Sequence, residues 1–186
     1  FRSRVEKVAV ASATSQDYAL CTMLHSNLAA AMFDSLQTDK RLVVLDVGMA
    51  MAATVDFFSQ FKSKLLFVDL YSEAFVSEIN EEVSHQQLVE QFRQALAIDD
   101  NCIIDICLFW DFFNYLDGTL IKAFIEALHP YVDEHTRGFG LGALNSRCQL
   151  PNSCYGLMTE DKLTQCPRSD EQRPVYPHSQ RDLNSH

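Results

Sequence analysis

Arg41-Leu-Val-Val-Leu-Asp-Val-Gly48 is the stretch of this 186-residue chain that decides the fold. Residues 42–45 are all aliphatic, which is typical of a strand buried on both faces, as strands of parallel sheets are. Gly48 ends the run, and residues 51–61 then place apolar side chains at helical spacing. A buried strand followed at once by a helix predicts a parallel α/β sheet.

The same alternation continues along the chain. Apolar runs at 64–69 and 103–110 predict two further strands, and the glycine-rich stretch 138–144 predicts a weaker fourth. Periodic apolar side chains predict helices over 82–97 and 117–128. The sequence therefore predicts an α/β fold with an open, mostly parallel sheet and flanking helices.

We place the α/β core at residues 41–145. The segments on either side of it have weaker hydrophobic patterns. An amphipathic helix is expected over 16–39, within an N-terminal helical segment 1–40. Four prolines and few aliphatic side chains predict a surface excursion from 146 to 177, with a short helix after His178, so that 146–186 adds no core element. The length of the whole chain, 1–186, favours one domain.

Composition narrows the classes of partner and compartment. Fifteen Lys and Arg against twenty-five Asp and Glu give a net charge of −10, which opposes binding to nucleic acid and to anionic membranes. The chain has neither a long uncharged apolar run nor a secretory signal, so it is expected to be cytoplasmic, with no membrane as partner. Six scattered cysteines without metal-ligand spacing predict reduced thiols and no metal site.

Acidic residues follow the predicted strands. In open parallel sheets ligands bind outside the carboxyl ends of the strands, where this chain has Asp46, Asp69 with Leu70, and Asp111. A carboxylate at the end of the second strand stands where it can accept hydrogen bonds from both hydroxyls of a ribose. The alternative for Asp69 is a capping or surface acid after a strand.

Three motifs together resemble a known family. Leu45-Asp-Val-Gly48, Phe67-Val-Asp69 and Asp105-Ile-Cys-Leu-Phe-Trp-Asp111 are similar to motifs of the Rossmann-type S-adenosylmethionine-dependent methyltransferases. The resemblance covers about 41–145. It implies S-adenosylmethionine as cofactor and methyl transfer to a small-molecule or protein acceptor.

The resemblance also implies roles for particular residues. Asp46 and Gly48 would lie against the methionine end of the cofactor, with Ala50 in the same turn. Asp69 would bind the adenosine ribose, next to Leu70. Asp111 would lie near the mouth of the cofactor or substrate site, and no catalytic residue is specified.

Two departures from the family pattern keep a second function open. Ala50 and Ala52 replace the second and third glycines of the usual turn, and each added methyl group narrows the approach to a ligand. The two strands that close the sheet in this family are not recognisable, which would expose an apolar sheet edge. A truncated chain, an unusually short sheet, or a second copy or partner chain that covers the edge would each account for this. The alternative is therefore a catalytically inactive scaffold of the same fold that binds a partner. A nicotinamide dehydrogenase is a further possibility, for which the altered turn is poorly suited.

Overall fold

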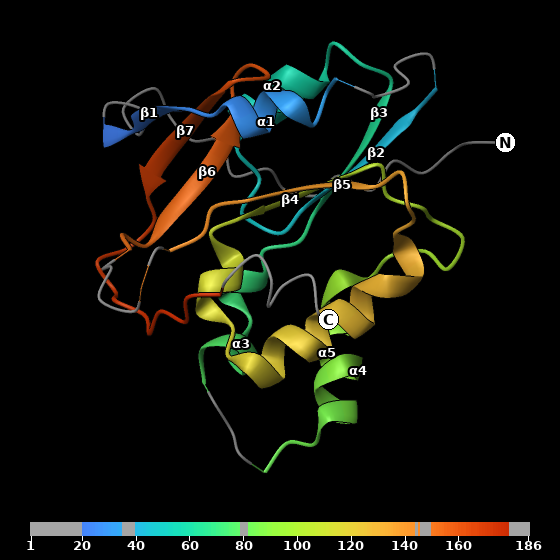
Figure 1. Cartoon of the computed structure of the whole chain (residues 1–186), viewed down its shortest axis with the longest axis vertical. Helices are drawn as coiled ribbons and strands as arrows, with labels where there is room; N and C mark the ends of the chain where they lie inside the picture. The colour runs from blue at the N-terminus through green and yellow to red at the C-terminus, as the bar shows by residue number, and fades with distance from the viewer. Residues whose placement is uncertain (1–19, 35–39, 79–81, 144, 146–149, 179–186) are drawn as a thin grey trace, which may run out of the picture.

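The computed structural model describes residues 20–34, 40–78, 82–143, 145 and 150–178. Within these ranges the chain forms a parallel sheet, an antiparallel sheet and five α-helices (Figure 1). In chain order the strands and α-helices are β1 (Thr22–His25), α1 (Asn27–Ala31), β2 (Leu42–Asp46), α2 (Ala52–Phe58), β3 (Ser63–Phe67), α3 (Ala74–Ser77), α4 (His85–Leu96), β4 (Ile106–Trp110), α5 (Gly118–Leu128), β5 (Arg137–Gly140), β6 (Ser153–Leu157) and β7 (Lys162–Pro167). Short 3-10 helices occupy Leu70–Ser72, Phe112–Tyr115 and His129–Tyr131.

The parallel sheet has the order β3-β2-β4-β5, and every neighbouring pair in it is parallel. Along β2, Leu42 and Val44 pack into one hydrophobic core, whereas Leu45 packs into another on the opposite face. Alternate side chains of one apolar run thus fill both faces of the sheet, as expected for a doubly covered parallel strand. The α/β class and the parallel sheet that the sequence predicts are confirmed.

Helices α4 and α5 begin where their caps require. Ser84 and Gln87 form a capping box at the start of α4, and the Asp117 carboxylate accepts hydrogen bonds from two amides in the first turn of α5. Both helices turn their apolar stripes towards the sheet, where Phe92 and Phe124 lie in contact, 5.3 Å between ring centroids. This packing fills the core on one face of the sheet.

The two faces of the parallel sheet are covered differently. Helices α3, α4 and α5 lie on one side, and α1, α2 and the antiparallel sheet lie on the other (Figure 1). The antiparallel sheet has the order β1-β7-β6. The lack of a side chain at Gly156 of β6 allows close packing against the start of α2. A Cβ there would approach Thr164 Cγ2 to 3.0 Å and Met51 Cβ to 3.1 Å. The start of α2 is therefore held under β6.

The predicted helix over 16–39 is wrong in the part that can be compared. Residues 22–25 form strand β1, antiparallel to β7, and α1 starts only after Ser26, whose side chain caps it. The apolar spacing was that of a helix, but main-chain pairing with a distant strand decides the local conformation here. The ends of the predicted helix, 16–19 and 35–39, lie outside the described residues.

The predicted surface excursion over 146–177 is also wrong in part. Strands β6 and β7 form a hairpin, and Tyr155, Leu157 and Leu163 are buried in the core shared with α1 and α2. Pro151 precedes β6 and Pro167 ends β7, where a missing N–H is tolerated, whereas Pro174 and Pro177 lie in the segment after β7. The short helix expected after His178 falls outside the described residues.

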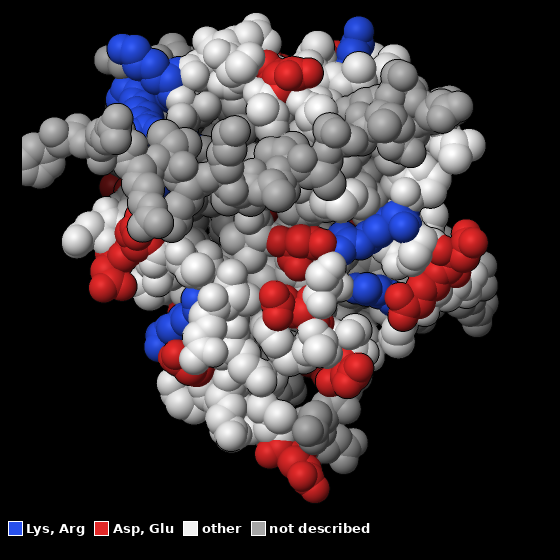
Figure 2. All heavy atoms as spheres, turned by 180° about the vertical axis from the view of Figure 1, so that it is seen from behind, with Lys and Arg blue, Asp and Glu red and all other residues white. Residues whose placement is uncertain are grey.

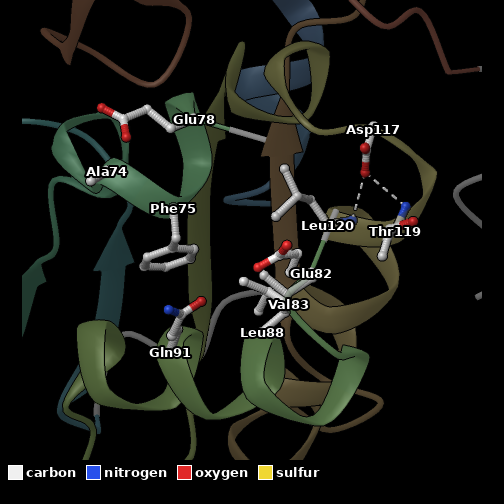
Figure 3. A pocket seen from close by; sticks show the side chains of 10 residues that line it. All are labelled: Ala74, Phe75, Glu78, Glu82, Val83, Leu88, Gln91, Asp117, Thr119 and Leu120. Atoms are coloured by element: carbon white, nitrogen blue, oxygen red, sulfur yellow. Dashed lines mark hydrogen bonds between the residues drawn. The ribbon is translucent and has the colours of Figure 1, made fainter. Parts of the chain in front are cut away.

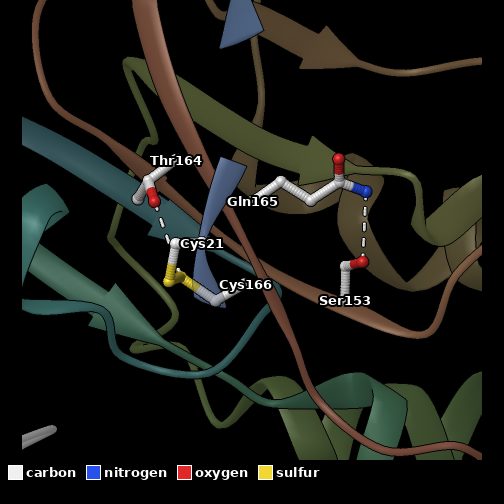
Figure 4. Close-up of a disulfide and its surroundings, with 5 residues drawn as sticks. All are labelled: Cys21, Ser153, Thr164, Gln165 and Cys166. Atoms are coloured by element: carbon white, nitrogen blue, oxygen red, sulfur yellow. Dashed lines mark hydrogen bonds between the residues drawn. A yellow bond between two sulfur atoms is a disulfide. The ribbon is translucent and has the colours of Figure 1, made fainter. Parts of the chain in front are cut away.

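The expectation of reduced thiols fails for two of the six cysteines. Cys21 and Cys166 form a disulfide that joins the residue before β1 to β7 across 145 positions of sequence (Figure 4). Cys154 is the β6 partner of Cys166 and lies buried in the same cluster as a free thiol. The scattered spacing gave no indication of the pair, because it is the pairing of β1 with β7 that brings Cys166 beside Cys21.

Charge is mixed on the face shown in Figure 2, where the described basic side chains lie close to acidic ones and form no continuous patch. None of the helices in the described ranges has both the length and the apolar character that a membrane span requires.

Candidate functional site

Three carboxylates stand at the carboxyl ends of the parallel strands. Asp46 is the last residue of β2, Asp111 directly follows β4, and Asp69 lies two residues after β3. Because β2 lies between β3 and β4, the three acids reach the same edge of the sheet. This edge is the candidate site, and we refer to it below as the carboxyl edge.

Asp46 is almost completely buried, with 1% of its surface exposed. Its Oδ1 accepts hydrogen bonds from the Gly48 amide at 2.9 Å and from Trp110 Nε1 at 2.7 Å, whereas Oδ2 is buried and has no partner in the part of the chain that the structure describes. Burial raises the pKa of Asp46 to about 7, the two hydrogen bonds oppose that rise, and the charge of nearby Asp69 adds to it. Asp46 is therefore a carboxyl group that changes protonation near neutral pH.

Trp110 closes over Asp46 in a strained backbone conformation. Its φ of 51° lies in the left-handed region, which costs a non-glycine residue about 1–3 kcal/mol. The indole stacks on the Tyr155 ring at an interplanar angle of 13° and donates its N–H to Asp46. These two contacts hold the strained residue in place at the end of β4.

The turn after β2 is narrow at Gly48. A Cβ on this residue would approach Asp46 Oδ1 and Trp110 Cδ1 to 3.3 Å each, so the glycine allows the indole to pack on the backbone. Ala50 is half-buried in the same turn. Met51 follows as the N-cap of α2 and makes no side-chain capping hydrogen bond.

Asp69 is held in place by Arg168, the residue that directly follows strand β7. Its Oδ2 accepts from Arg168 Nη2 at 2.5 Å and from Ser72 Oγ at 2.8 Å. Its Oδ1 is buried and has no partner within the described ranges. Leu70 beside it is fully buried and packs into the core under α4 and α5, so its side chain does not line the carboxyl edge.

Asp111 accepts hydrogen bonds from three tyrosine hydroxyls. Tyr71 donates at 2.7 Å, Tyr115 at 3.0 Å and Tyr155 at 3.1 Å. Burial raises the pKa of Asp111, and the three hydroxyls oppose that rise by stabilising the carboxylate. The three donors come from the segments after β3, after β4 and within β6, so Asp111 joins the two sheets.

The chain after β7 runs across this edge as an extended strap, residues 168–178. Arg168 binds Asp69, Arg173 Nη1 donates to the Tyr71 carbonyl at 2.9 Å, and the Tyr176 amide donates to the Asn114 carbonyl at 2.7 Å. His178 Nε2 lies 2.8 Å from the Leu116 carbonyl. Arg173 Nε is buried and has no acceptor among the residues that the structure describes.

The carboxyl edge thus holds three buried polar atoms that lack partners among the described residues: Asp46 Oδ2, Asp69 Oδ1 and Arg173 Nε. Buried polar atoms are nearly always hydrogen-bonded in folded proteins, and each that is not costs about 1–3 kcal/mol. Two acceptors and one donor at this edge therefore have hydrogen-bonding capacity that the described residues do not use. No group of three or more His, Cys, Asp or Glu side chains in the described ranges could hold a metal ion.

Sequence reasoning identified the acids of the edge but missed the contacts that the segment after residue 150 makes there. Arg168, Arg173 and Tyr155 come from the segment that had been expected to lie on the surface. No local pattern marks them, because each reaches the edge only through the β6–β7 hairpin. Comparisons with protein-family models, with curated proteins and with solved structures find no match.

Proposed function

We propose that this chain binds S-adenosylmethionine at the carboxyl edge and is a methyltransferase-like protein. The observation that carries the proposal is the pair of buried, unpartnered oxygens on neighbouring acids, Asp46 Oδ2 and Asp69 Oδ1. A ribose has two adjacent hydroxyls that donate hydrogen bonds, which suits carboxylate oxygens that lack donors. Arg173 Nε adds a donor that a carboxylate or carbonyl of the same ligand can use.

The residues at the carboxyl edge offer the types of polar group that this ligand would need. Asp69 would accept from the ribose, and Asp46 with Gly48 would shape the floor of the site under the Trp110 indole. The cofactor supplies an electrophilic methyl group when it is bound. Methyl transfer depends mainly on alignment of the acceptor with that group, so the chain's part is to orient the ligand and exclude water. The acceptor in this proposal is a small molecule or a protein.

A second candidate function, a scaffold without turnover, is supported by a different observation. Arg168 already forms an ion pair with Asp69. Tyr155 from β6 donates its hydroxyl proton to Asp111, and its ring stacks on the Trp110 indole. The chain's own hairpin and strap thus supply partners that a ligand would otherwise supply. A protein of this kind would present its fold to a partner without transferring a methyl group.

Calorimetric titration of S-adenosylmethionine and S-adenosylhomocysteine tests the first proposal. We expect wild-type protein to bind, and Asp69→Asn to weaken binding by about 10- to 100-fold, as loss of hydrogen bonds to a charged acceptor implies. Asp56→Asn, an exposed acid on α2, is the matched control and should bind like wild type. Equal affinity in Asp69→Asn and wild type contradicts the ribose role.

Arg168→Ala distinguishes the scaffold from the binding protein. This variant removes the ion pair with Asp69, so binding that appears only in Arg168→Ala would show that the strap closes a competent site. Absence of heat and of a thermal shift with millimolar ligand, in both wild type and Arg168→Ala, would favour the scaffold.

A further inference from the structure

Three cysteines lie in one row across the antiparallel sheet. Strand β7 is the middle strand in the order β1-β7-β6, and Cys166 lies near its end. Cys154 of β6 is paired directly with it on one side. On the other side the β1–β7 register continues from Thr22 to Cys21, which is bonded to Cys166 with 4.2 Å between the two Cα atoms. Cys166 therefore has a cysteine on both sides of it, and we refer to the three residues as the cysteine row.

The spacing of Cys154 and Cys166 suits a disulfide. The Arg168 amide donates to the Asn152 carbonyl at 2.9 Å, and Cys154 and Cys166 lie two positions further along the two strands. Hydrogen-bonded and non-hydrogen-bonded pairs alternate along antiparallel strands, so Cys154 and Cys166 form a hydrogen-bonded pair. The Cα atoms of such a pair are about 5.5 Å apart and the side chains share one face, which lies within the range that disulfides span.

The free thiol of the row is buried beside the disulfide. Cys154 and Cys166 form a small buried cluster with Met51, and Cys21 packs against it. Burial raises the pKa of the Cys154 thiol, whereas the positive charge of Arg168 and its hydrogen bond to the thiol oppose that rise. The thiol is therefore mostly protonated at neutral pH, and a basic buffer increases the reactive thiolate.

The other free thiols in the described ranges lie on the far side of the parallel sheet. Cys107 is buried in the core beneath α4 and α5, and Cys102 packs against that core. A hollow of about 850 Å³ between α3, α4 and α5 lies on the same side, and none of its lining residues is a cysteine (Figure 3). Among the described cysteines, Cys154 is thus the thiol placed to attack the disulfide.

We propose that Cys154 is an exchange partner for the disulfide, whose thiolate attacks Cys166 Sγ and displaces Cys21. Such attack places the entering and leaving sulfurs on opposite sides of the attacked sulfur, and the strand order provides this arrangement. The Cys154–Cys166 bond forms as the Cys21–Cys166 bond breaks, so there is no net oxidation. Cys154 gives its proton to solvent, and the released Cys21 thiolate takes one up.

The exchange changes what holds β1 in the sheet. The β6–β7 hairpin keeps a cross-link, now within itself, whereas the residue before β1 is released from β7. Strand β1 is then attached by main-chain pairing alone. This proposal does not depend on S-adenosylmethionine binding, and its test contains no ligand.

Trapping with N-ethylmaleimide tests the exchange in the folded, oxidised full chain at about pH 8.5, with peptide mapping that omits reduction. We expect Cys21 to be modified as fast as a peptide with a Cys154–Cys166 bond appears, because the reagent captures the released thiol. In Cys154→Ala, modification of Cys21 should be at least about tenfold slower. Cys102→Ser, which removes a thiol outside the row, should behave like wild type. Cys148→Ser, at a position outside the described residues, should do so too.

Cys21→Ser gives a second test that does not depend on the rate of exchange. Purified with its thiols free, this variant should form the Cys154–Cys166 bond when oxidised glutathione is added, with release of two molecules of reduced glutathione. In Cys21→Ser/Cys154→Ala the same treatment should form no such bond.

Three results would each overturn the proposal. The first is a folded wild type in which Cys21 stays unmodified, whether or not Cys154 reacts with the reagent directly. The second is modification of Cys21 that is equally fast in Cys154→Ala and wild type. The third is oxidised Cys21→Ser without a Cys154–Cys166 bond.

Discussion

Replacing Cys166 with serine is expected to lower the free energy of unfolding by about 2–5 kcal/mol. The Cys21–Cys166 disulfide closes a segment with a sequence separation of 145, and in the chain-entropy account a longer closed loop gives a larger stabilisation. Without the bond, β1 is attached to β7 only by strand pairing at the edge of a three-stranded sheet. Urea denaturation of the oxidised wild type and of the variant measures the difference.

Three comparisons make this result specific to the bond. Cys102→Ser removes a half-buried free thiol and should cost clearly less than Cys166→Ser. Cys21→Ser should match Cys166→Ser, and the double variant should be no less stable than either single variant, because each already breaks the same bond. If Cys166→Ser costs no more than Cys102→Ser, or if a dithiol reductant leaves the wild type equally stable, the disulfide does not support the fold in solution.

The buried strands and the helix starts of this fold are the parts that can be predicted from the sequence. The runs 42–45 and 106–110 are apolar at nearly every position because both faces of a central parallel strand are buried, and that requirement is local and visible. The start of α5 was predicted for a similar reason, since Asp117 bonds to amides only two and three residues away, whereas α4 begins at His85, three residues after the predicted start at residue 82.

Strands β1, β6 and β7 were not readable in this way. β1 has three exposed residues out of four, so it lacks the alternation that marks a half-buried strand. Its conformation is fixed by main-chain bonds to β7, about 140 residues away, and by Cys166. The turn between β6 and β7 includes a hydrogen bond from Thr159 Oγ1 to the Asp161 carboxylate at 2.7 Å, which the sequence analysis did not use.

In the candidate site, too, some residues could be predicted from the sequence and others could not. Asp46, Asp69 and Asp111 follow strands, and the topology of a parallel sheet places such residues at one edge. Their partners Arg168 and Tyr155 arrive from the hairpin, which no local pattern indicated. The cytoplasmic location expected from the sequence is still a prediction. The Cys21–Cys166 disulfide argues against it, because disulfides persist mainly in oxidising compartments.

The buried carboxyl of Asp46 predicts a stability that falls as pH rises. Its pKa is raised from an ordinary value of 3.8 to about 7, so between these values the folded chain binds a proton that the unfolded chain has released. Asp46 therefore favours the folded state most below about pH 4, and this contribution is lost progressively until about pH 7. The difference between the two pKa values corresponds to roughly 4 kcal/mol.

Asp46→Asn isolates this contribution, because asparagine does not titrate and its Oδ1 can still accept from Gly48 and Trp110. Urea denaturation at several pH values from about 4.5 to 8 should show the variant gaining stability relative to wild type as pH rises, by roughly 3 kcal/mol over this range. Asp56→Asn, which replaces an exposed acid, should keep a constant difference from wild type over this range. A difference between Asp46→Asn and wild type that is the same at pH 5 and pH 8 would mean that Asp46 is ionised throughout. Its Oδ2 would then need a donor, and a bound ligand that donates to it would lower the pKa and reduce the pH dependence.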